Sequence, residues 1–425
     1  MKHSYKDSKV EWLGFIPEEW EIGKIGQVYT ERREKVSDED YPPLSVTMQG
    51  IVPQLSSAAK SDAHDNRKLV LTGDFAINSR SDRRGSCGIS KYDGSVSLIN
   101  TVLKPKAKMN PNYYDWVFHS TVFADEYYKW GHGIVDDLWT TNWQDMKRIS
   151  IPIPPITEQK IIADFLKNEC EVVDLLILNT KQSIEEYKKM KKIIITDATT
   201  KGLKANVKMK KSGIEWIEEI PENWEVLKFK YLTTDVFKGA GITKEDVIEN
   251  GEIPCVRYGE IYTQYNFHFD KCKSRTNEDC VSQPRYFSYG DILFTCTGEL
   301  VEEIGKAIVY LGSEKCMAGG DIIVARHKQN PIFMSYALNS NYAQSQRSYG
   351  KAKLKVVHAS AYDINNTIMI IPPIEEQEEI ATYLDEKCTE IDSIIEAKEI
   401  LAKELELYKK SLIYEYVTGK RRVVD

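Results

Sequence analysis

The sequence predicts an α+β protein built as two similar halves, each with a globular block around a sheet core and a long helix after it. Two internal repeats predict this organisation. A 49-residue segment that begins at Pro154 returns without a gap at Pro372, and sixteen of its 49 positions are identical. A shorter segment, residues 8–24, returns as residues 212–228. The order is therefore A-B-A′-B′, and a repeat of this kind decides the architecture.

The repeat boundaries divide the chain into four predicted segments. A length of 425 residues suits several cores rather than one. Its 42% hydrophobic and 28% charged residues are typical of a globular protein. We expect globular blocks at 1–153 and 204–371, and helices at 154–203 and 372–425.

The two repeated 49-residue segments are predicted to be helices that pair along a seam. The proline pairs that open them cannot lie inside a helix, but apolar residues recur behind them every seven positions. Each helix of about 40 residues would measure roughly 60 Å. We expect the two to pack as an antiparallel coiled coil, with the halves related by an approximate two-fold axis. The apolar rows are Leu166, Val173, Tyr187 and Ile194 with Cys170, Ile177 and Ile184, then Leu384, Ile391, Leu405 and Leu412 with Cys388, Ile395 and Ala402.

The globular blocks share landmarks although their sequences diverge. A Gly-Asp turn followed by an apolar strand occurs at 71–77 and again at 288–294, and the second block carries about 13 extra residues before this point. Further strands are predicted at 307–311, 321–327 and 367–373, and short helices near 113–120 and 332–340. The repeated tryptophans are expected to fill cores rather than to stack on ligands. They are Trp12, Trp20, Trp216 and Trp224.

Composition and motifs exclude several classes of function. The net charge of −7 argues mildly against a protein that grips a polyanion alone, although the last 55 residues account for −6 of it. The eight cysteines form no C-x-x-C pair, so reduced thiols are expected and no metal site. The absence of a long apolar run and of a secretion signal predicts a cytoplasmic protein without a membrane role. We find no G-x-G-x-x-G, P-loop or H-E-x-x-H motif, which favours a binding module over an enzyme.

Polar loops that diverge on a common frame have suitable chemistry for double-stranded DNA. Arginine can pair with guanine, while hydroxyls and lysines hold phosphates. For any single residue a solvated surface is the commoner role, but these loops recur at corresponding places in both blocks. The candidate DNA contacts are Arg32, Arg33, Ser79, Arg80, Arg83, Arg84, Thr140, Asn142, Arg257, Thr295, Thr297, Lys306, Arg347, Lys351, Lys353 and Lys355.

Several motifs agree in type and order with one protein family. PPITEQKIIADFL and PPIEEQEEIATYL open the helices, and Thr200-Lys201-Gly202 and Thr418-Gly419-Lys420 close them. S-x-x-E-W followed by I-P-x-x-W opens each half, and GDILFTCTGE with GKAIV lies in the second block. In these motifs the chain resembles the specificity subunits of type I restriction-modification systems. The first block departs at the last motif, where it reads GDFAINSRSDRRGSCGIS.

The resemblance implies a division of labour in a complex. Each globular block would be a target recognition domain that reads one half of an interrupted DNA site, while the helices set the gap. Two modification (methyltransferase) subunits, and restriction subunits that translocate and cleave DNA, would join this non-catalytic chain. They would carry S-adenosylmethionine, ATP and Mg, and this chain would bind no cofactor. The implied docking and spacer residues on the helices are Gln159, Leu166, Val173, Ile177, Gln377, Leu384, Ile391 and Ile395.

Two alternatives remain open at the level of sequence. The first is a coiled-coil adaptor without DNA readout, which a lack of sequence-selective binding would favour. The second is the recognition part of a self-sufficient restriction or methyltransferase enzyme, which cofactor binding by the isolated chain would favour.

Overall fold

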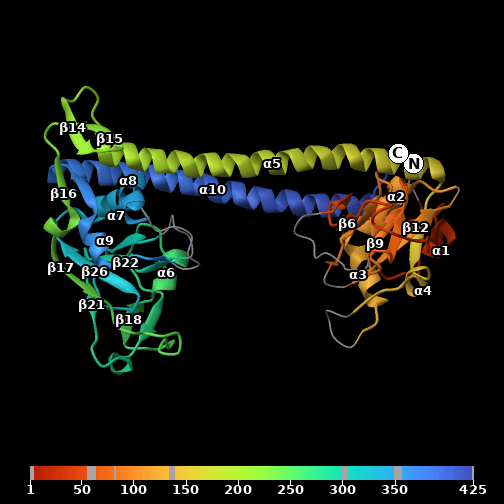
Figure 1. Ribbon diagram of the computed structural model, residues 1–425, viewed down its shortest axis with the longest axis horizontal. Helices are drawn as coiled ribbons and strands as arrows, with labels where there is room; N and C mark the ends of the chain where they lie inside the picture. Colours follow the sequence, from red (N-terminus) through yellow and green to blue (C-terminus); the bar gives the residue numbers. More distant parts are fainter. Residues whose placement is uncertain are drawn as a thin grey trace. The chain divides into compact units, whose positions relative to one another are not determined.

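The computed structural model describes residues 4–54, 64–80, 83–106, 108–133, 139–298, 304–348 and 357–423. The chain divides into two compact units (Figure 1). Unit 1 comprises residues 1–181 and 399–425, and unit 2 comprises residues 182–398. Each unit therefore contains one globular block together with part of each long helix.

The two long helices lie within the predicted segments. Helix α5 spans Ile156–Lys201 and helix α10 spans Ile374–Val417, with 46 and 44 residues. Most residues of the predicted seven-residue rows are buried, because they face the other helix or a globular block. The seam is thus confirmed. Among the helices of the described residues, none is both long and apolar enough to cross a membrane.

Ion pairs show that the helices run antiparallel in each unit. In unit 1, Lys409 lies 2.6 Å from Asp174, and Lys181, further along α5, pairs with Glu406, earlier in α10, at 2.8 Å. In unit 2, Lys191 pairs with Asp392 at 2.6 Å. The pairs Asp174–Lys409 and Asp392–Lys191 occupy equivalent repeat positions, since 218 residues separate the members of each equivalence. The repeat therefore places the same Asp–Lys ion pair between the two helices once in each unit.

Unit 1 is built around a four-stranded antiparallel sheet of order β10-β9-β12-β4, with a second sheet of order β11-β8-β5. Helices α2 and α3 bury their aromatic side chains against the first sheet. The strands of these sheets are β4 (Tyr29–Glu31), β9 (Phe75–Asn78), β10 (Cys87–Ile89), β12 (Asn100–Pro105), β5 (Lys35–Val36), β8 (Arg67–Val70) and β11 (Gly94–Val96). The remaining elements are β1 (Tyr5–Asp7), β2 (Phe15–Pro17), β3 (Glu21–Lys24), α1 (Ile25–Val28), β6 (Leu44–Thr47), β7 (Gly50–Pro53), α2 (Pro111–His119), α3 (Thr121–Lys129), α4 (Trp143–Met146) and β13 (Ser150–Ile153).

Unit 2 repeats this order and extends it by one strand. Its main sheet runs β17-β26-β22-β24-β19, in which β19 pairs parallel to β24 and the other neighbours are antiparallel. The strands of both sheets are β17 (Thr233–Lys238), β18 (Ile253–Val256), β19 (His268–Phe269), β20 (Ser274–Thr276), β21 (Tyr286–Phe287), β22 (Ile292–Thr295), β24 (Ala307–Tyr310), β25 (Cys316–Ala318) and β26 (Ile322–His327). The remaining elements are β14 (Met209–Ile214), β15 (Ile217–Pro221), β16 (Glu225–Lys228), η3 (Phe229–Tyr231), α6 (Tyr258–Thr263), η4 (Glu278–Cys280), β23 (Thr297–Gly298), α7 (Pro331–Asn339), α8 (Asn341–Ser348), β27 (Val357–His358), α9 (Ala361–Asn366) and β28 (Ile368–Ile371).

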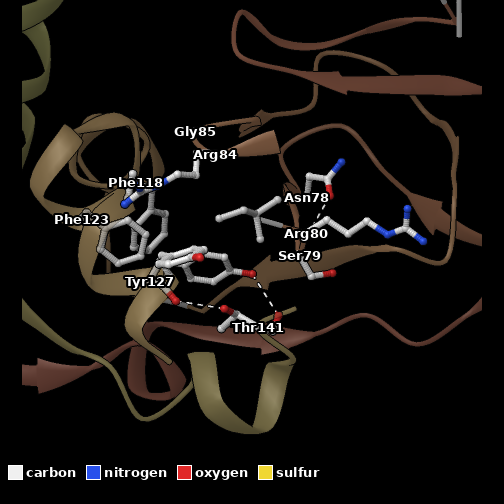
Figure 2. A pocket seen from close by; sticks show the side chains of 12 residues that line it. Asn78, Ser79, Arg80, Arg84, Gly85, Phe118, Phe123, Tyr127 and Thr141 are labelled. Carbon is white, nitrogen blue, oxygen red and sulfur yellow. Dashed lines mark hydrogen bonds between the residues drawn. The ribbon is translucent and has the colours of Figure 1, made fainter. Parts of the chain in front are cut away.

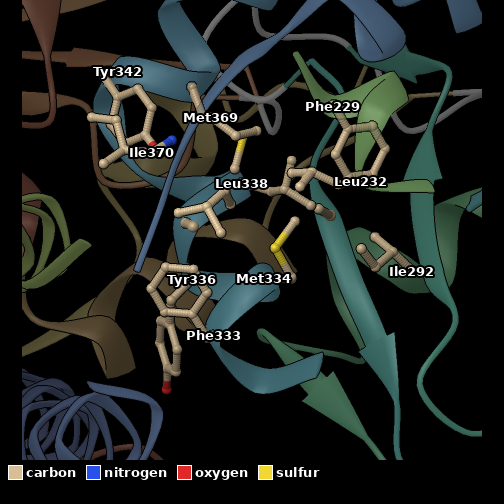
Figure 3. Close-up of a cluster of buried hydrophobic side chains, with 14 of the residues drawn as sticks. Phe229, Leu232, Ile292, Phe333, Met334, Tyr336, Leu338, Tyr342, Met369 and Ile370 are labelled. Carbon is tan, nitrogen blue, oxygen red and sulfur yellow. The ribbon is translucent and has the colours of Figure 1, made fainter. Parts of the chain in front are cut away.

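The core of unit 2 forms where helix α7 packs on this sheet and on strand β28. Figure 3 shows Met334 and Leu338 of α7 near the centre of the cluster, with Ile292 of the sheet and Met369 of β28 around them and Phe333 of α7 beside Tyr336. The five side chains other than Tyr336 are fully buried. The extra strand β19 and helix α6 account for the additional residues expected in this block.

Tryptophans tie the start of each half to the start of its long helix. The Trp20 indole N–H donates to a Glu158 carboxylate oxygen at 2.8 Å, and Trp224 donates in the same way to Glu376 at 2.8 Å. Both rings are fully buried, and Trp12 is 7% exposed. The prediction of a core role is wrong for Trp216, which is 51% exposed because it lies in the turn between β14 and β15.

Candidate nucleic-acid interface

Unit 1 presents a polar edge where strand β9 ends. The strand is buried throughout, and the exposed Arg80 follows two residues after its last position. The Ser79 carbonyl accepts from the Thr141 backbone N–H at 3.0 Å, and Arg80 forms an antiparallel bridge with Thr140. Thr140 also exchanges two backbone hydrogen bonds with His132, at 2.9 and 3.0 Å. We call residues 78–80, 131–133 and 139–142 the unit 1 edge.

A small cavity opens at this edge over an aromatic floor (Figure 2). Phe118, Phe123 and Tyr127 form the floor, and Arg80 and Thr141 lie on the rim. Burial raises the pKa of Tyr127 well above its ordinary value, so its hydroxyl stays protonated and donates to the Thr141 carbonyl at 3.1 Å. The cavity measures about 20 Å³. That space admits a water molecule or a methyl-sized group but not a nucleobase.

A second arginine, Arg84, lines the cavity beside this edge and is held by aromatic and acidic neighbours. The Arg84 guanidinium lies 4.8 Å from the centre of the Tyr128 ring and forms an ion pair with Asp125. The Trp139 indole N–H donates to the Tyr128 carbonyl at 2.9 Å. Arg84 is therefore oriented by its neighbours, and a cation–π contact made by an exposed cation contributes about 0.5–1 kcal/mol.

Unit 2 carries an equivalent edge with different side chains. Strand β22 is followed by Thr297, which pairs in register with His358 of β27. Thr297 and His358 occupy the repeat positions of Arg80 and Thr140, at offsets of 217 and 218. The Thr297 hydroxyl lies 3.3 Å from His358 Nδ1, and the Tyr262 hydroxyl donates to the Thr297 carbonyl at 2.9 Å. We call Tyr262, Thr297 and His358 the unit 2 edge.

The two edges combine one backbone arrangement with two sets of hydrogen-bonding groups. Unit 1 offers a guanidinium and a hydroxyl, whereas unit 2 offers a hydroxyl and an imidazole. Groups of these kinds can donate to or accept from base edges and phosphates. An arrangement of this kind can therefore present different recognition chemistry from the same frame.

Thr295 and Arg347 are buried and Arg32 is half-buried in an ion pair, so the structure contradicts their assignment as DNA contacts. Arg32 pairs with Asp74 through a bond of 3.2 Å between Nη2 and Oδ1, and that hydrogen bond raises the pKa of Arg32. Thr295 is fully buried, with its hydroxyl 2.7 Å from the Tyr262 hydroxyl. Arg347 is 1% exposed, and burial lowers its pKa to about 10. Side chains packed in this way brace the core and do not reach a ligand.

Other candidates lie at the surface or in structural contacts. Arg33 is exposed and pairs with Glu31 at 2.7 Å, and Arg83 is also exposed. Asn142 caps helix α4. Arg257 pairs with Glu260 at 3.0 Å, and Lys306 donates to the carbonyls of Ile261 and Tyr265 at 2.7 Å each. The candidates Lys351, Lys353 and Lys355 lie outside the described residues.

The eight docking and spacer residues expected on the helices face the other helix or a globular block of this chain. Seven of them are at most 9% exposed, and Ile177 is half-buried. Gln159 and Gln377 accept hydrogen bonds at 2.9 Å from the backbone N–H groups of Asn110 and Asn330, within their own units. Their burial agrees with the spacer role, because this chain itself covers these side chains.

Sequence reasoning missed Tyr262 and His358. His358 could have been found by adding the repeat offset of 218 to Thr140, whereas Tyr262 belongs to the segment that unit 2 has in addition. All eight cysteines are free thiols. No group of three or more His, Cys, Asp or Glu side chains in the described ranges could hold a metal ion.

Both halves of the chain match one known protein family. A model of the type I restriction modification DNA specificity domain matches residues 17–186 and again residues 221–404. The chain belongs to this family. It is a specificity subunit of a type I restriction-modification system, as the sequence motifs predicted, and neither the adaptor nor the self-sufficient enzyme is favoured.

Relatives of similar length support this assignment. The MjaVIII specificity subunit of Methanocaldococcus jannaschii is 26% identical, over 96% of this chain and 94% of the relative. The putative MjaX specificity subunit of the same organism is 25% identical, over 97% of this chain and 96% of the relative.

Two solved structures share the fold. A chain from a study of complex assembly and conformational transition in the type I R-M system superposes with a TM-score of 0.73 and 14% identity, over 96% of this chain and 99% of that one. The HsdS subunit of Thermoanaerobacter tengcongensis superposes with a TM-score of 0.55 and 16% identity, over 96% of this chain and 98% of that one. The predicted α+β fold of repeated sheet domains with long helices is thus confirmed.

Proposed function

We propose that this specificity subunit reads an interrupted target in double-stranded DNA, with one half of the target read by each unit. The pair of edges carries the proposal. One backbone bridge holds Arg80 beside Thr140 in unit 1, and its equivalent holds Thr297 beside His358 in unit 2. Arginine favours guanine in the major groove, whereas hydroxyls and imidazoles accept a wider set of base edges. Different side chains on one frame let a single chain specify two unlike half-sites.

The chemistry of modification is proposed to belong to partner subunits. Two methyltransferase subunits would bring S-adenosylmethionine and methylate adenine, and restriction subunits would bring ATP and Mg. This chain would bind DNA, position these partners in the cytoplasm and catalyse no step. The family resemblance supports this division of labour.

An apolar stripe on helix α5 in unit 1 is the proposed docking surface for a methyltransferase subunit. Ile161, Val172, Leu175 and Leu176 lie on one face at helical spacing and are 41–56% exposed. Exposed apolar stripes of this kind mark protein contacts. This stripe replaces the seam residues that the sequence suggested.

A domain exchange tests the reading of two half-sites. Residues 1–153 are replaced by the corresponding block of another type I specificity subunit, and methylated adenines are mapped across the genome. We expect one half of the methylated sequence to change and the other to remain. The matched exchange of residues 204–371 should change the other half. A change of both halves in either exchange would contradict the proposal.

A further inference from the structure

A groove in unit 2 separates helix α5 from the recognition block. It encloses about 590 Å³. Residues of α5 form one wall, and Asp392 and Ile395 of α10 contribute to it. The rest is formed by residues of α6, α7 and α8, by Lys306 just before β24, and by the segment between α6 and β19. The charged residues that line it are Lys188, Lys189, Lys191, Lys192, Lys306, Glu185 and Asp392. Five lysines against two carboxylates give the groove a positive charge within a chain whose net charge is −7.

The two carboxylates are already engaged by single lysines. Glu185 pairs with Lys188 at 3.0 Å, and Asp392 pairs with Lys191 at 2.6 Å. Lys189 and Lys192 are exposed and form no ion pair with any residue that the structure describes. Unpaired lysines that share one groove repel one another, so an anion placed there lowers the free energy of the site.

We propose that this groove holds the phosphate backbone of the DNA beside the half-site that unit 2 reads, and this inference rests on the proposed function. The groove adjoins the unit 2 edge, because Tyr262 lines it and also donates to the Thr297 carbonyl. The amide side chains of Asn266 and Gln344 line it as well. Lysines and amides are the groups that hold phosphates without reading sequence.

A protein partner fits the groove less well than DNA does. Lysine is depleted in protein interfaces, whose centres are apolar or aromatic. The basic run is also fuller in this half, because the positions equivalent to Lys188 and Lys189 on α10 are Glu406 and Leu407, whereas Lys191 and Lys192 are matched by Lys409 and Lys410. The groove therefore adds a sequence-independent grip on one side of the target.

The test removes three charges and measures the salt dependence of binding. The full complex with methyltransferase subunits carries Lys188→Gln, Lys189→Gln and Lys192→Gln, and binding to cognate and non-cognate DNA is followed as KCl is raised. The slope of log K against log salt is negative, and each lost phosphate contact reduces its magnitude by about 0.9. For two to three lost contacts we therefore expect the magnitude to fall by about 2 to 3. Affinity should fall in similar proportion for both DNAs, with the recognised sequence unchanged.

Matched variants separate the possible outcomes. Lys167→Gln, Lys201→Gln and Lys387→Gln remove the same charge from exposed helix positions outside the groove and should leave the slope unchanged. Arginine at positions 188, 189 and 192 should restore it. A wild-type slope in the glutamine variant would overturn the inference, and so would a loss of subunit assembly in place of DNA affinity, since that result assigns the groove to an acidic protein. If the wild-type complex showed no sequence selectivity, the proposed function itself would fail.

Discussion

His327 is a residue whose surroundings couple the stability of unit 2 to pH. It ends strand β26, and its Nδ1 accepts from the Gln329 backbone N–H at 3.1 Å. Its Nε2 is buried without a hydrogen-bond partner among the described residues. Burial lowers the pKa of His327 from 6.5 to about 4. The folded state therefore holds this imidazole neutral at a pH where the unfolded chain is already protonated.

The sign of the effect follows from this lowered pKa. As the pH falls, the unfolded state binds the proton at a higher pH than the folded state does. The contribution of neutral, buried His327 to the free energy of unfolding is therefore present above about pH 6.5 and is lost as the pH falls towards about 4. We expect His327→Asn to remove on the order of 1–3 kcal/mol of that acid sensitivity, while its amide oxygen keeps the bond from Gln329. Urea unfolding at a series of pH values measures this. The exposed His64, changed to Asn, is the control, and an identical pH dependence in wild type and H327N would refute the argument.

Single residues are also where the sequence was least informative. The charge of Arg32 and Arg347 predicts DNA contacts. In the structure, however, Arg32 pairs with the carboxylate of Asp74, 42 residues away in the sequence, and Arg347 is buried in the core. Neither distance along the chain nor residue type reveals such a contact. Arg80 remains a surface residue because strand β9 ends just before it.

Among the elements, the long helices were predictable because their signal is local. A seven-residue apolar repeat needs no knowledge of distant segments. Both helices begin, and α5 ends, within two residues of the predicted boundaries, whereas α10 ends eight residues before residue 425. The edges were only partly predictable. Their backbone bridges join segments that are 60 residues apart in unit 1, at Arg80 and Thr140, and 61 residues apart in unit 2, at Thr297 and His358. Only the repeat offset links the two sets.

Each long helix is followed by a glycine that packs closely against a tryptophan, and this packing can be tested. Gly419 follows α10 with φ +73°, and a Cβ there would lie 2.8 Å from Pro17 and 2.9 Å from the Trp20 ring. Gly419→Ala therefore adds a steric clash to the left-handed strain of about 1–2 kcal/mol, and overpacking costs about 1–3 kcal/mol more. Gly73→Ala is the matched control, since Gly73 has φ +90° and open space around it.

We expect chemical denaturation to rank the two variants clearly. G73A should lose only the backbone contribution, whereas G419A should lose about 2–5 kcal/mol. Equal losses would mean that the helix end does not pack on Trp20 in solution. Gly202, which follows α5 with φ +76°, would place a Cβ 3.1 Å from Trp224, so G202A should fall between them.

For the whole molecule, the distribution of charge agrees with a DNA-binding chain that works with partners. The final 55 residues contribute −6, whereas residues 151–210, which include the basic run on α5, sum to +3. A net charge of −7 therefore hides a local basic surface in unit 2. The phosphate grip and the base-reading edges are separate features, so substitutions in them should differ in their effect on sequence preference and on salt dependence.

The independence of the two edges gives a last prediction. Each edge is built from residues of its own unit, so Arg80→Ala and His358→Ala should each relax the sequence preference in a different half of the target. Each should cost about 1–3 kcal/mol of discrimination. In the double variant the losses should add within about 0.5 kcal/mol, because independent sites do not couple. Competition binding of the full complex against randomised half-sites measures both quantities, with the exposed Lys91→Ala as a neutral control. Strong non-additivity, or two variants that relax the same half of the target, would show that the edges act as one site. The two edges would then not read different half-sites from one shared backbone arrangement.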